Sequence, residues 1–208
     1  MADKNRSGRE TIIKAGRELF RKHGVKRISI GEICKTASIS RVTFYKHFND
    51  KDDLLLCIAK IFSQKFFAKM TGIISDKHLP FEEKAARVNA LKSAGIKELG
   101  EEFVKDIAGN KTPLAAKYSR QMRIKRLQLA KRLFVTARRN GEIRSDLPVE
   151  FMLYMLNKVN DIYCEIQGDK TLRKSFSGSM DIVKKLFLIY CRGIISRPKK
   201  KGRKTRRR

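Results

Sequence analysis

Apolar residues recur at intervals of three and four along almost the whole chain, and no useful stretch alternates apolar and polar residues with period two. Near the start, Ile12, Leu19 and Phe20 fall on one face of a helix that Gly24 would end. The 208 residues are therefore expected to form an all-α fold. The predicted helices cover approximately 8–23, 29–36, 40–47, 51–70, 81–91, 98–108, 113–140, 148–167 and 177–195.

The helices near the N-terminus carry their own start signals. Ser29 and Glu32 have the spacing of a capping box, in which the serine hydroxyl accepts the Glu32 amide and the carboxylate returns to the Ser29 amide. Ser40 and Asp50 are further N-cap residues, each directly before an apolar helical pattern. Three short helices joined by tight turns therefore precede a long fourth helix.

The third short helix is too small to be stable alone, so we expect its function to lie in the side chains that it exposes to a partner. The major groove of B-DNA admits a helix and displays a distinct pattern at each base pair, and a helix-turn-helix delivers its second helix there. Arg41, Thr43 and Lys46 supply polar reach, and Val42 can contact a thymine methyl. The pattern predicts double-stranded DNA as a partner.

The charge of the chain agrees with an anionic partner. Lys and Arg number 49 against 21 Asp and Glu, which gives a formal charge of +28. Residues 197–208 hold nine of these basic residues and no acidic one, and are expected to be a disordered tail that adds DNA affinity by releasing counterions. RNA and an acidic membrane surface are also compatible with charge alone.

Residues 29–54 resemble the DNA-binding signature of the TetR family of regulators. The signature falls on the positions Ser29, Ile33, Cys34, Ala37, Ser38, Ile39, Ser40, Thr43, Tyr45, Phe48, Lys51 and Leu54. Three positions depart from the family pattern: Cys34 stands where Ala is usual, and Ser38 and Val42 stand where Gly is common. Ser38 must then adopt the backbone conformation that Gly normally takes, and Val42 should narrow the accepted bases.

The resemblance also implies roles for individual residues. Ser29 would cap the second helix at a phosphate, Ile33, Cys34, Phe48 and Leu54 would be core, and base edges would be faced by the start of the third helix. The complete expected DNA-binding set is Ser29, Ser40, Arg41, Val42, Thr43, Tyr45, Lys46, His47 and Lys51. Within it, the resemblance assigns Tyr45, His47 and Lys51 to backbone phosphates.

In the rest of the chain the resemblance implies a helical ligand-binding and dimerisation domain. Aromatic and Met residues at helical spacing are expected to line a cavity for an unknown small-molecule effector, with ordinary core as the alternative. These residues are Phe62, Phe66, Phe103, Tyr118, Met122 and Phe134. The last two long helices are apolar around much of their circumference, which predicts a two-fold four-helix interface between two copies. The residues expected there are Met152, Leu156, Val159, Tyr163, Val183, Leu186 and Tyr190.

These features predict a helix-turn-helix domain at 1–50, a ligand-binding and dimerisation domain at 51–196 and a basic tail at 197–208. We expect a homodimeric, sequence-specific transcriptional repressor that binds a palindromic operator and is released by its ligand. A sequence-tolerant, nucleoid-like architectural DNA-binding protein is the main alternative, and an adaptor that binds RNA or an acidic membrane is a weaker one. A competition titration against random duplex separates the regulator from the architectural protein.

Other functional classes find little support in the sequence. The three histidines, at 23, 47 and 78, lie in no spacing typical of a nucleophile, a general base or a metal site, so we expect no enzyme, no metal and no cofactor. Four separate cysteines, at 34, 57, 164 and 191, are expected to be buried free thiols, with redox sensing as the alternative. The start of the chain has no apolar signal region and no long apolar span follows, so we expect a soluble, cytoplasmic protein without a membrane partner.

Overall fold

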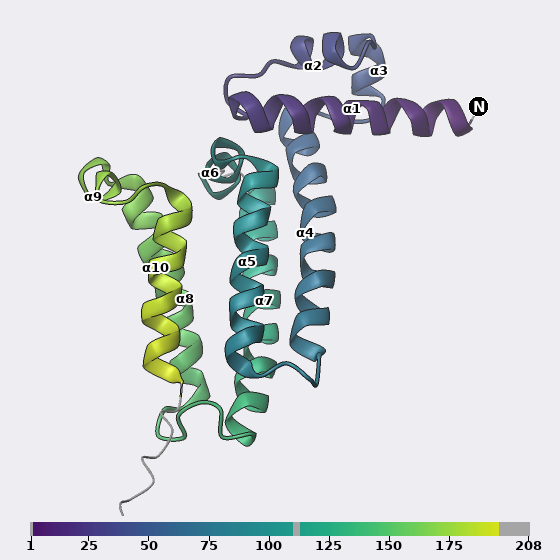
Figure 1. The fold of residues 1–208 in the computed structure, drawn as a ribbon. Helices are drawn as coiled ribbons and strands as arrows, with labels where there is room; N and C mark the ends of the chain where they lie inside the picture. The colour runs from purple at the N-terminus through teal and green to yellow at the C-terminus, as the bar shows by residue number, and fades with distance from the viewer. Residues whose placement is uncertain (1, 110–112, 196–208) are drawn as a thin grey trace, which may run out of the picture. The chain divides into compact units, whose positions relative to one another are not determined.

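The computed structural model describes residues 2–109 and 113–195, and within them every regular element is a helix. A single isolated β-bridge, between Ile143 and Ile195, is the one strand-like feature of the described residues. The helices shown in Figure 1 are α1 (Ala2–His23), α2 (Ile30–Thr36), α3 (Arg41–Tyr45), α4 (Lys51–Ser75), α5 (Phe81–Leu99), α6 (Glu101–Gly109), α7 (Pro113–Arg139), α8 (Val149–Gly168), α9 (Lys170–Lys174) and α10 (Ser179–Ile194). The all-α prediction is confirmed.

Most predicted helices are present, but some of their bounds differ. Helix α5 continues eight residues beyond the predicted end at Leu91. It passes through Gly95, where a Cβ atom would lie 2.8 Å from the Phe62 ring, so the glycine permits close packing against α4 within the helix. The short α9 was not predicted; Asp169 caps it by accepting hydrogen bonds from the amides of Thr171 and Leu172.

The chain divides into two compact units, which are described separately. The first comprises the residues up to Asp76 together with Ala86–Leu129, and the second comprises Lys77–Ala85 and the residues from Ala130 onward. The domain boundaries predicted at residues 50 and 196 stay predictions. The predicted tail at 197–208 lies outside the described residues.

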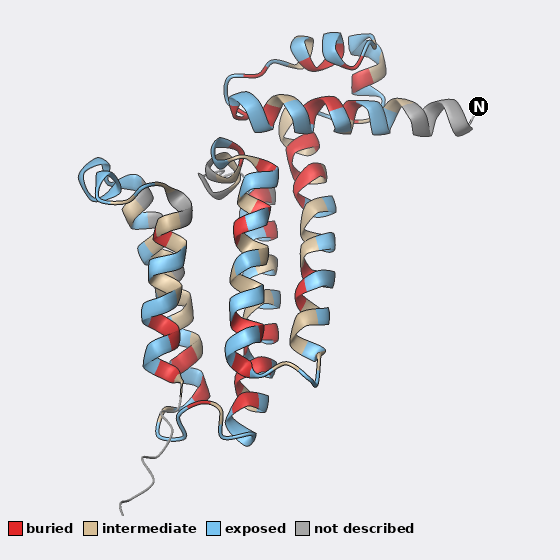
Figure 2. Cartoon of the chain, in the orientation of Figure 1, coloured by how far each residue is buried: buried red, intermediate tan, exposed pale blue. Residues whose placement is uncertain are grey.

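The core of the first unit lies where α1, α2, α3, α4 and α6 meet, as the buried positions in Figure 2 show. Its buried residues are Ile12, Phe20, Val25, Ile28, Ile33, Cys34, Phe44, Phe48, Leu54, Leu55, Ile58, Leu99 and Phe103. Each large apolar side chain buried in this way contributes about 1.5–3 kcal/mol relative to exposure. The core positions implied by the resemblance are all among them and are confirmed.

The first unit continues along α4 and α7, where two smaller clusters pack. Tyr118 on α7 lies 9% exposed against α4, and its hydroxyl donates to the Ala59 carbonyl at 2.9 Å and lies 2.6 Å from the Ser63 hydroxyl. Farther along, Met70 of α4 packs against Leu129 of α7. Burial raises the pKa of the Tyr118 hydroxyl.

The second unit has an aromatic core. The Phe134 ring lies 6.0 Å from that of Phe81 and 6.3 Å from that of Tyr190. The Tyr190 hydroxyl donates to the Met152 carbonyl at 2.7 Å, which joins α10 to α8. Burial raises the pKa of Tyr190 far above its usual range.

Among the described residues, no helix combines the length and hydropathy needed to cross a membrane.

Candidate nucleic-acid interface

Helices α2 and α3 begin at the caps that the sequence predicts. The Ser29 hydroxyl accepts from the Glu32 amide at 3.2 Å, while the Glu32 carboxylate accepts from the Ser29 amide at 2.8 Å, so the predicted capping box is confirmed. These hydrogen bonds from Ser29 hold the pKa of Glu32 below its usual range. Ser40 accepts from the Thr43 amide at 3.1 Å and starts α3. Local hydrogen bonds therefore fix the first turn of both helices.

The turn between α2 and α3 contains a strained residue. Ser38 has φ of +53°, and it is the one non-glycine residue with positive φ in the described chain. This conformation costs an L-residue about 1–2 kcal/mol. Ser38 therefore does take the backbone conformation that Gly normally adopts, as expected from the resemblance.

Helix α3 separates a buried side from an exposed one. Phe44 is fully buried and packs 5.9 Å from the Phe48 ring, which anchors α3 on the core. On the other side Val42 is 67% and Tyr45 is 55% exposed, and Lys46 is exposed beside them. Helix α3 has five residues, fewer than the predicted range 40–47, and the Tyr45 ring packs edge-on against Phe44 at 5.5 Å. The large exposed fractions of Val42 and Tyr45 favour contact with a partner.

The Arg41 side chain folds back across the first turn of α2. A Cβ atom at Gly31 would lie 3.1 Å from Arg41 Nη2 and 3.7 Å from Ser29 Oγ. The guanidinium and the Ser29 hydroxyl therefore lie close together, at the helix end where Ser29 was expected to meet a phosphate. The charge of Arg41 also opposes the effect of burial, which raises the pKa of the Cys34 thiol.

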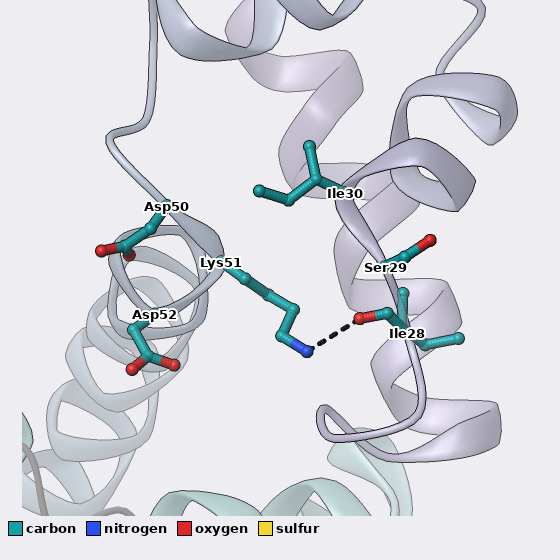
Figure 3. A pocket seen from close by; sticks show the side chains of 6 residues that line it. All are labelled: Ile28, Ser29, Ile30, Asp50, Lys51 and Asp52. Carbon is teal, nitrogen blue, oxygen red and sulfur yellow. Dashed lines mark hydrogen bonds between the residues drawn. The ribbon is translucent and has the colours of Figure 1, made fainter.

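Lys51 spans the gap between α4 and the segment before α2 (Figure 3). Its ammonium donates to the carbonyl oxygens of Val25 and Ile28, both at 2.8 Å. The side chain crosses an open depression that Ser29 and Asp50 help to line. Two of its three N–H donors are thus used inside the protein, and one remains for a phosphate.

His47 and Arg9 show how α1 contributes to this surface. The His47 ring lies against α1, since a Cβ atom at Gly8 would be 3.3 Å from its Nε2. Arg9 lies over the Phe48 ring at 5.3 Å, and its guanidinium donates to Cys57 Sγ at 3.0 Å. Sequence reasoning missed Arg9, because only the packing of α1 on α3 and α4 brings this cation to the end of α3.

The structure does not gather the six expected ligand-lining residues in one place. Phe62 and Phe66 stack at 6.3 Å along α4, and Tyr118 and Met122 pack beside α4 from α7. Phe103 lies instead in the core of the first unit, 6.0 Å from Phe20, and Phe134 lies in the second unit. Phe62 also packs against Gly95 of α5 and the first-unit core, so Phe66, Tyr118 and Met122 are the three of the six that share the α4–α7 region.

Two of the seven residues expected at a dimer interface are buried within the second unit. Met152 and Tyr190 are 1% and 9% exposed and bond to each other inside the second unit. The remaining five, Leu156, Val159, Tyr163, Val183 and Leu186, are half-buried. The large apolar side chains that α8 and α10 expose are Phe151, Tyr154, Met155, Ile162, Leu188 and Ile189. Helical periodicity alone could not distinguish the face toward the neighbouring helix from the face toward solvent.

Cysteines and metal ligands add no further site among the described side chains. Cys34 and Cys191 are buried and free, while Cys57 is free but half-buried, which corrects the prediction for that residue. The Cys164 side chain lies outside the described residues. No group of three His, Cys, Asp or Glu side chains in the described chain could hold a metal ion.

Comparison with known proteins places this helix-turn-helix in a family. Residues 12–58 match the family model described as "Bacterial regulatory proteins, tetR family". The matched segment runs from α1 into α4 and includes every expected DNA-binding residue. The N-terminal part of the chain therefore belongs to the TetR family.

A curated relative and several solved structures agree with this assignment. The chain is 32% identical over 74 residues to the HTH-type transcriptional regulator SAB2452 of Staphylococcus aureus, a match that spans 36% of this chain and 40% of that protein. The fold is similar to that of SmeT, the repressor of the Stenotrophomonas maltophilia multidrug efflux pump SmeDEF, with a TM-score of 0.68, 15% identity and 90% of each chain covered. It is also similar to FadR of Bacillus subtilis in complex with stearoyl-CoA, with a TM-score of 0.66, 17% identity and coverage of 87% of this chain and 96% of that one. At these identities the structural likeness shows the fold alone.

Proposed function

We propose that the chain is a sequence-specific DNA-binding transcriptional regulator. The observation that carries the proposal is the α2–turn–α3 unit, in which two capped helices rest on a buried core and α3 exposes Val42, Tyr45 and Lys46 together. A helix presented in this way enters the major groove, and side chains at its start reach base edges. Ser29, Lys51 and His47 then hold the flanking phosphates that set the register.

The regulator acts as a homodimer formed through α8 and α10. Each of these helices exposes apolar side chains: Ile189 of α10 is 71% exposed, and Tyr154 of α8 is 58% exposed although the Lys158 ammonium lies 5.7 Å from its ring centre. A two-fold pairing buries these side chains and presents two copies of α3 to a palindromic site. This proposal replaces Met152 and Tyr190 at the interface with the exposed residues.

The regulator is a repressor that a small molecule releases from its operator. SmeT is named a repressor, and FadR was solved with stearoyl-CoA, which supports an apolar ligand in a fold of this kind. The aromatic residues between α4 and α7 are the proposed lining. A ligand there must favour the non-binding arrangement, because a ligand with equal affinity for both arrangements changes nothing.

Helix α6 offers a route from the helical region to the DNA-binding domain. The Asp106 carboxylate accepts from the Val25 amide at 2.6 Å, in the segment between α1 and α2. Phe103 packs on Phe20, and Arg17 of α1 pairs with Glu98 of α5 at 2.6 Å. A change in the position of α6 would therefore displace α1 and the segment that leads to α2, because both are in direct contact with this part of the chain.

Site selection with purified protein from a genomic fragment library tests the proposal. We expect enrichment of one palindromic motif, bound at least roughly 10³-fold more tightly than random duplex. The formal charge of +28 favours the alternative of a sequence-tolerant architectural protein. An operator-to-random ratio near one would establish that alternative instead.

A further inference from the structure

Much of the positive charge of the first unit lies outside the helix-turn-helix. Within α4 and α7, residues 54–75 carry three lysines and residues 113–129 carry five basic residues, and neither segment has an acidic residue. Both segments belong to the first unit. Of these eight cations, seven form no ion pair with any described carboxylate: Lys60, Lys65, Lys69, Lys117, Arg120, Arg123 and Lys125.

Three contacts define how α4 and α7 lie together. Tyr118 reaches Ala59 and Ser63 near one end, the Lys125 ammonium lies 4.9 Å from the centre of the Phe67 ring, and Met70 packs against Leu129 farther along. The contacting residues advance in the same direction on both helices, so α4 and α7 run parallel.

The parallel arrangement places three lysines on one face. Each residue of a helix is rotated by about 100° from the one before it. When two parallel helices touch at a pair of residues, the residue that follows the contact on one helix therefore points to the same side of the helix pair as the residue that precedes the contact on the other. Lys60 follows Ala59, and Lys117 precedes Tyr118. Lys125 reaches toward α4 on that side. Together with the exposed glutamines at the same helical positions, they form what we call the Lys–Gln face: Lys60, Gln64, Lys117, Gln121, Lys125 and Gln128.

We propose that the Lys–Gln face binds the phosphate backbone of duplex DNA without reading its sequence, at a segment other than the one that α3 reads. Lysine ammonium and glutamine amide groups are both frequent donors to phosphate oxygens. From Lys117 to Gln128 the face extends roughly 16 Å along α7, which spans about five phosphates of one strand.

The chemistry of the face favours nucleic acid over a lipid surface. Helices that lie on membranes insert Trp, Phe or Leu side chains below the headgroups. Here Phe67 is only 6% exposed beneath Lys125, and Ile124, which is 47% exposed between Gln121 and Gln128, is a single aliphatic side chain among lysines and amides rather than an apolar stripe. The Lys125 contact also orders its ammonium before DNA arrives, which lowers the entropy lost on binding.

The helix-turn-helix and the Lys–Gln face lie at different places in the first unit. Lys60 is nine residues, or roughly 13 Å, along α4 from its first residue, and α4 runs away from the α1–α3 bundle (Figure 1). The face therefore lies apart from α3 within the first unit, and its proposed occupant is a second duplex, which the protein would hold together with the first.

The test uses two full-length variants with equal net charge. The face variant carries Lys60→Gln, Lys117→Gln and Lys125→Gln, and the control carries Lys65→Gln, Lys69→Gln and Lys97→Gln, three exposed lysines of the same unit that lie off the face. Affinity for a random-sequence duplex is measured against salt concentration. Thermal unfolding checks that both variants fold.

We expect the face variant to bind random duplex with a salt slope shallower by about 2.7, because each phosphate contact contributes about 0.9. The control should change the slope by less than about 1. Repeating the measurement in an Arg41→Ala, Tyr45→Ala, Lys46→Ala background removes α3 as a contributor, and the face substitutions should lower the residual binding there too. If no operator were found but this result were obtained, the proposed sequence-specific regulation would be refuted, and the proposal that the Lys–Gln face binds DNA would stand.

Equal slope changes in the face and control variants would overturn the proposal, since charge alone would then explain the effect. No change in either would also overturn it. Vesicles containing phosphatidylserine form the third arm: a loss of vesicle binding with unchanged DNA binding would assign the face to a membrane instead.

Discussion

Arg41 and Lys51 both bring positive charge to the proposed DNA-binding surface of the protein, but the structure holds them differently. The Arg41 guanidinium rests against Gly31 and can extend, whereas the Lys51 ammonium is bonded to two carbonyls. We expect Arg41→Ala to cost about 1–3 kcal/mol at one operator position and to relax base preference there. Lys51→Ala should weaken binding to all sequences alike. Affinities for a panel of operator variants measure the difference, and a uniform loss for both mutants would remove base reading from Arg41.

The Ser38 backbone predicts a stabilising substitution. Ser38→Gly removes the steric cost of φ at +53° but adds glycine's unfolded-state entropy, so the expected net gain is about 0.5–1 kcal/mol. Equilibrium denaturation of the full chain measures it. Ser145→Gly, at an exposed position without positive φ, is the control and should bring no gain. A loss of stability in Ser38→Gly would show that the serine makes compensating contacts.

At this scale, sequence reasoning succeeded where the interaction is local. The caps at Ser29 and Ser40 involve residues three positions apart, so their spacing suffices to predict them. The carbonyl partners of Lys51 lie 23 and 26 residues away, and the Arg9 contact with Cys57 joins residues 48 apart. Such contacts depend on how helices pack, which no local spacing reveals.

Among the elements, α6 makes the clearest testable contact. Asp106 accepts from the Val25 amide at 2.6 Å and from the Lys26 amide at 3.4 Å. Asp106→Ala leaves the part-buried Val25 amide without an acceptor and should cost about 1–3 kcal/mol. Hydrogen exchange at Val25 should accelerate with it. Glu101→Ala, at an exposed position of α6, is the control, and equal effects of both substitutions would argue against a specific role for Asp106.

The order of the helices was largely predictable, and the errors have physical causes. The apolar period of 3.6 and the capping residues predicted α2 to within one residue at its start and correctly at its end. The length of α5 was underestimated because Gly95 is favourable only when the Phe62 ring packs against it. Which side of α8 meets α10 depends on tertiary packing, and so the exposed residues were missed.

At the scale of the whole molecule, the exposed residues of α10 predict which substitutions dissociate the proposed dimer. Ile189→Glu places a charge on a side chain that is 71% exposed, so it should dissociate a dimer without unfolding the protomer. Tyr190→Glu should unfold the second unit instead, because that residue is buried against Phe134. Sedimentation and circular dichroism distinguish the two results. A monomeric wild-type protein at micromolar concentration would contradict the proposed interface.

The basic residues 197–208 predict a second property of the whole chain. Their nine positive charges have no apolar companions, so we expect them to add sequence-independent affinity. Deleting 197–208 should flatten the salt dependence and weaken binding to random duplex, while the operator-to-random ratio stays level or rises. That ratio is measured for both proteins at two salt concentrations. A large fall on deletion would mean that this segment reads the operator.

The joint between α5 and α6 determines how stiff the connection to α1 is. Gly100 has φ of +88°, and a Cβ atom there would lie 2.6 Å from the carbonyl oxygen of Arg21. The main chain of Gly100 thus lies directly beside the Arg21 carbonyl group, with Arg21 Cγ next to it. A side chain can change rotamer and absorb a displacement, but planar peptide groups cannot. We therefore expect a displacement of Gly100 to move the last turn of α1 with it, because the main chains of the two segments are in direct contact.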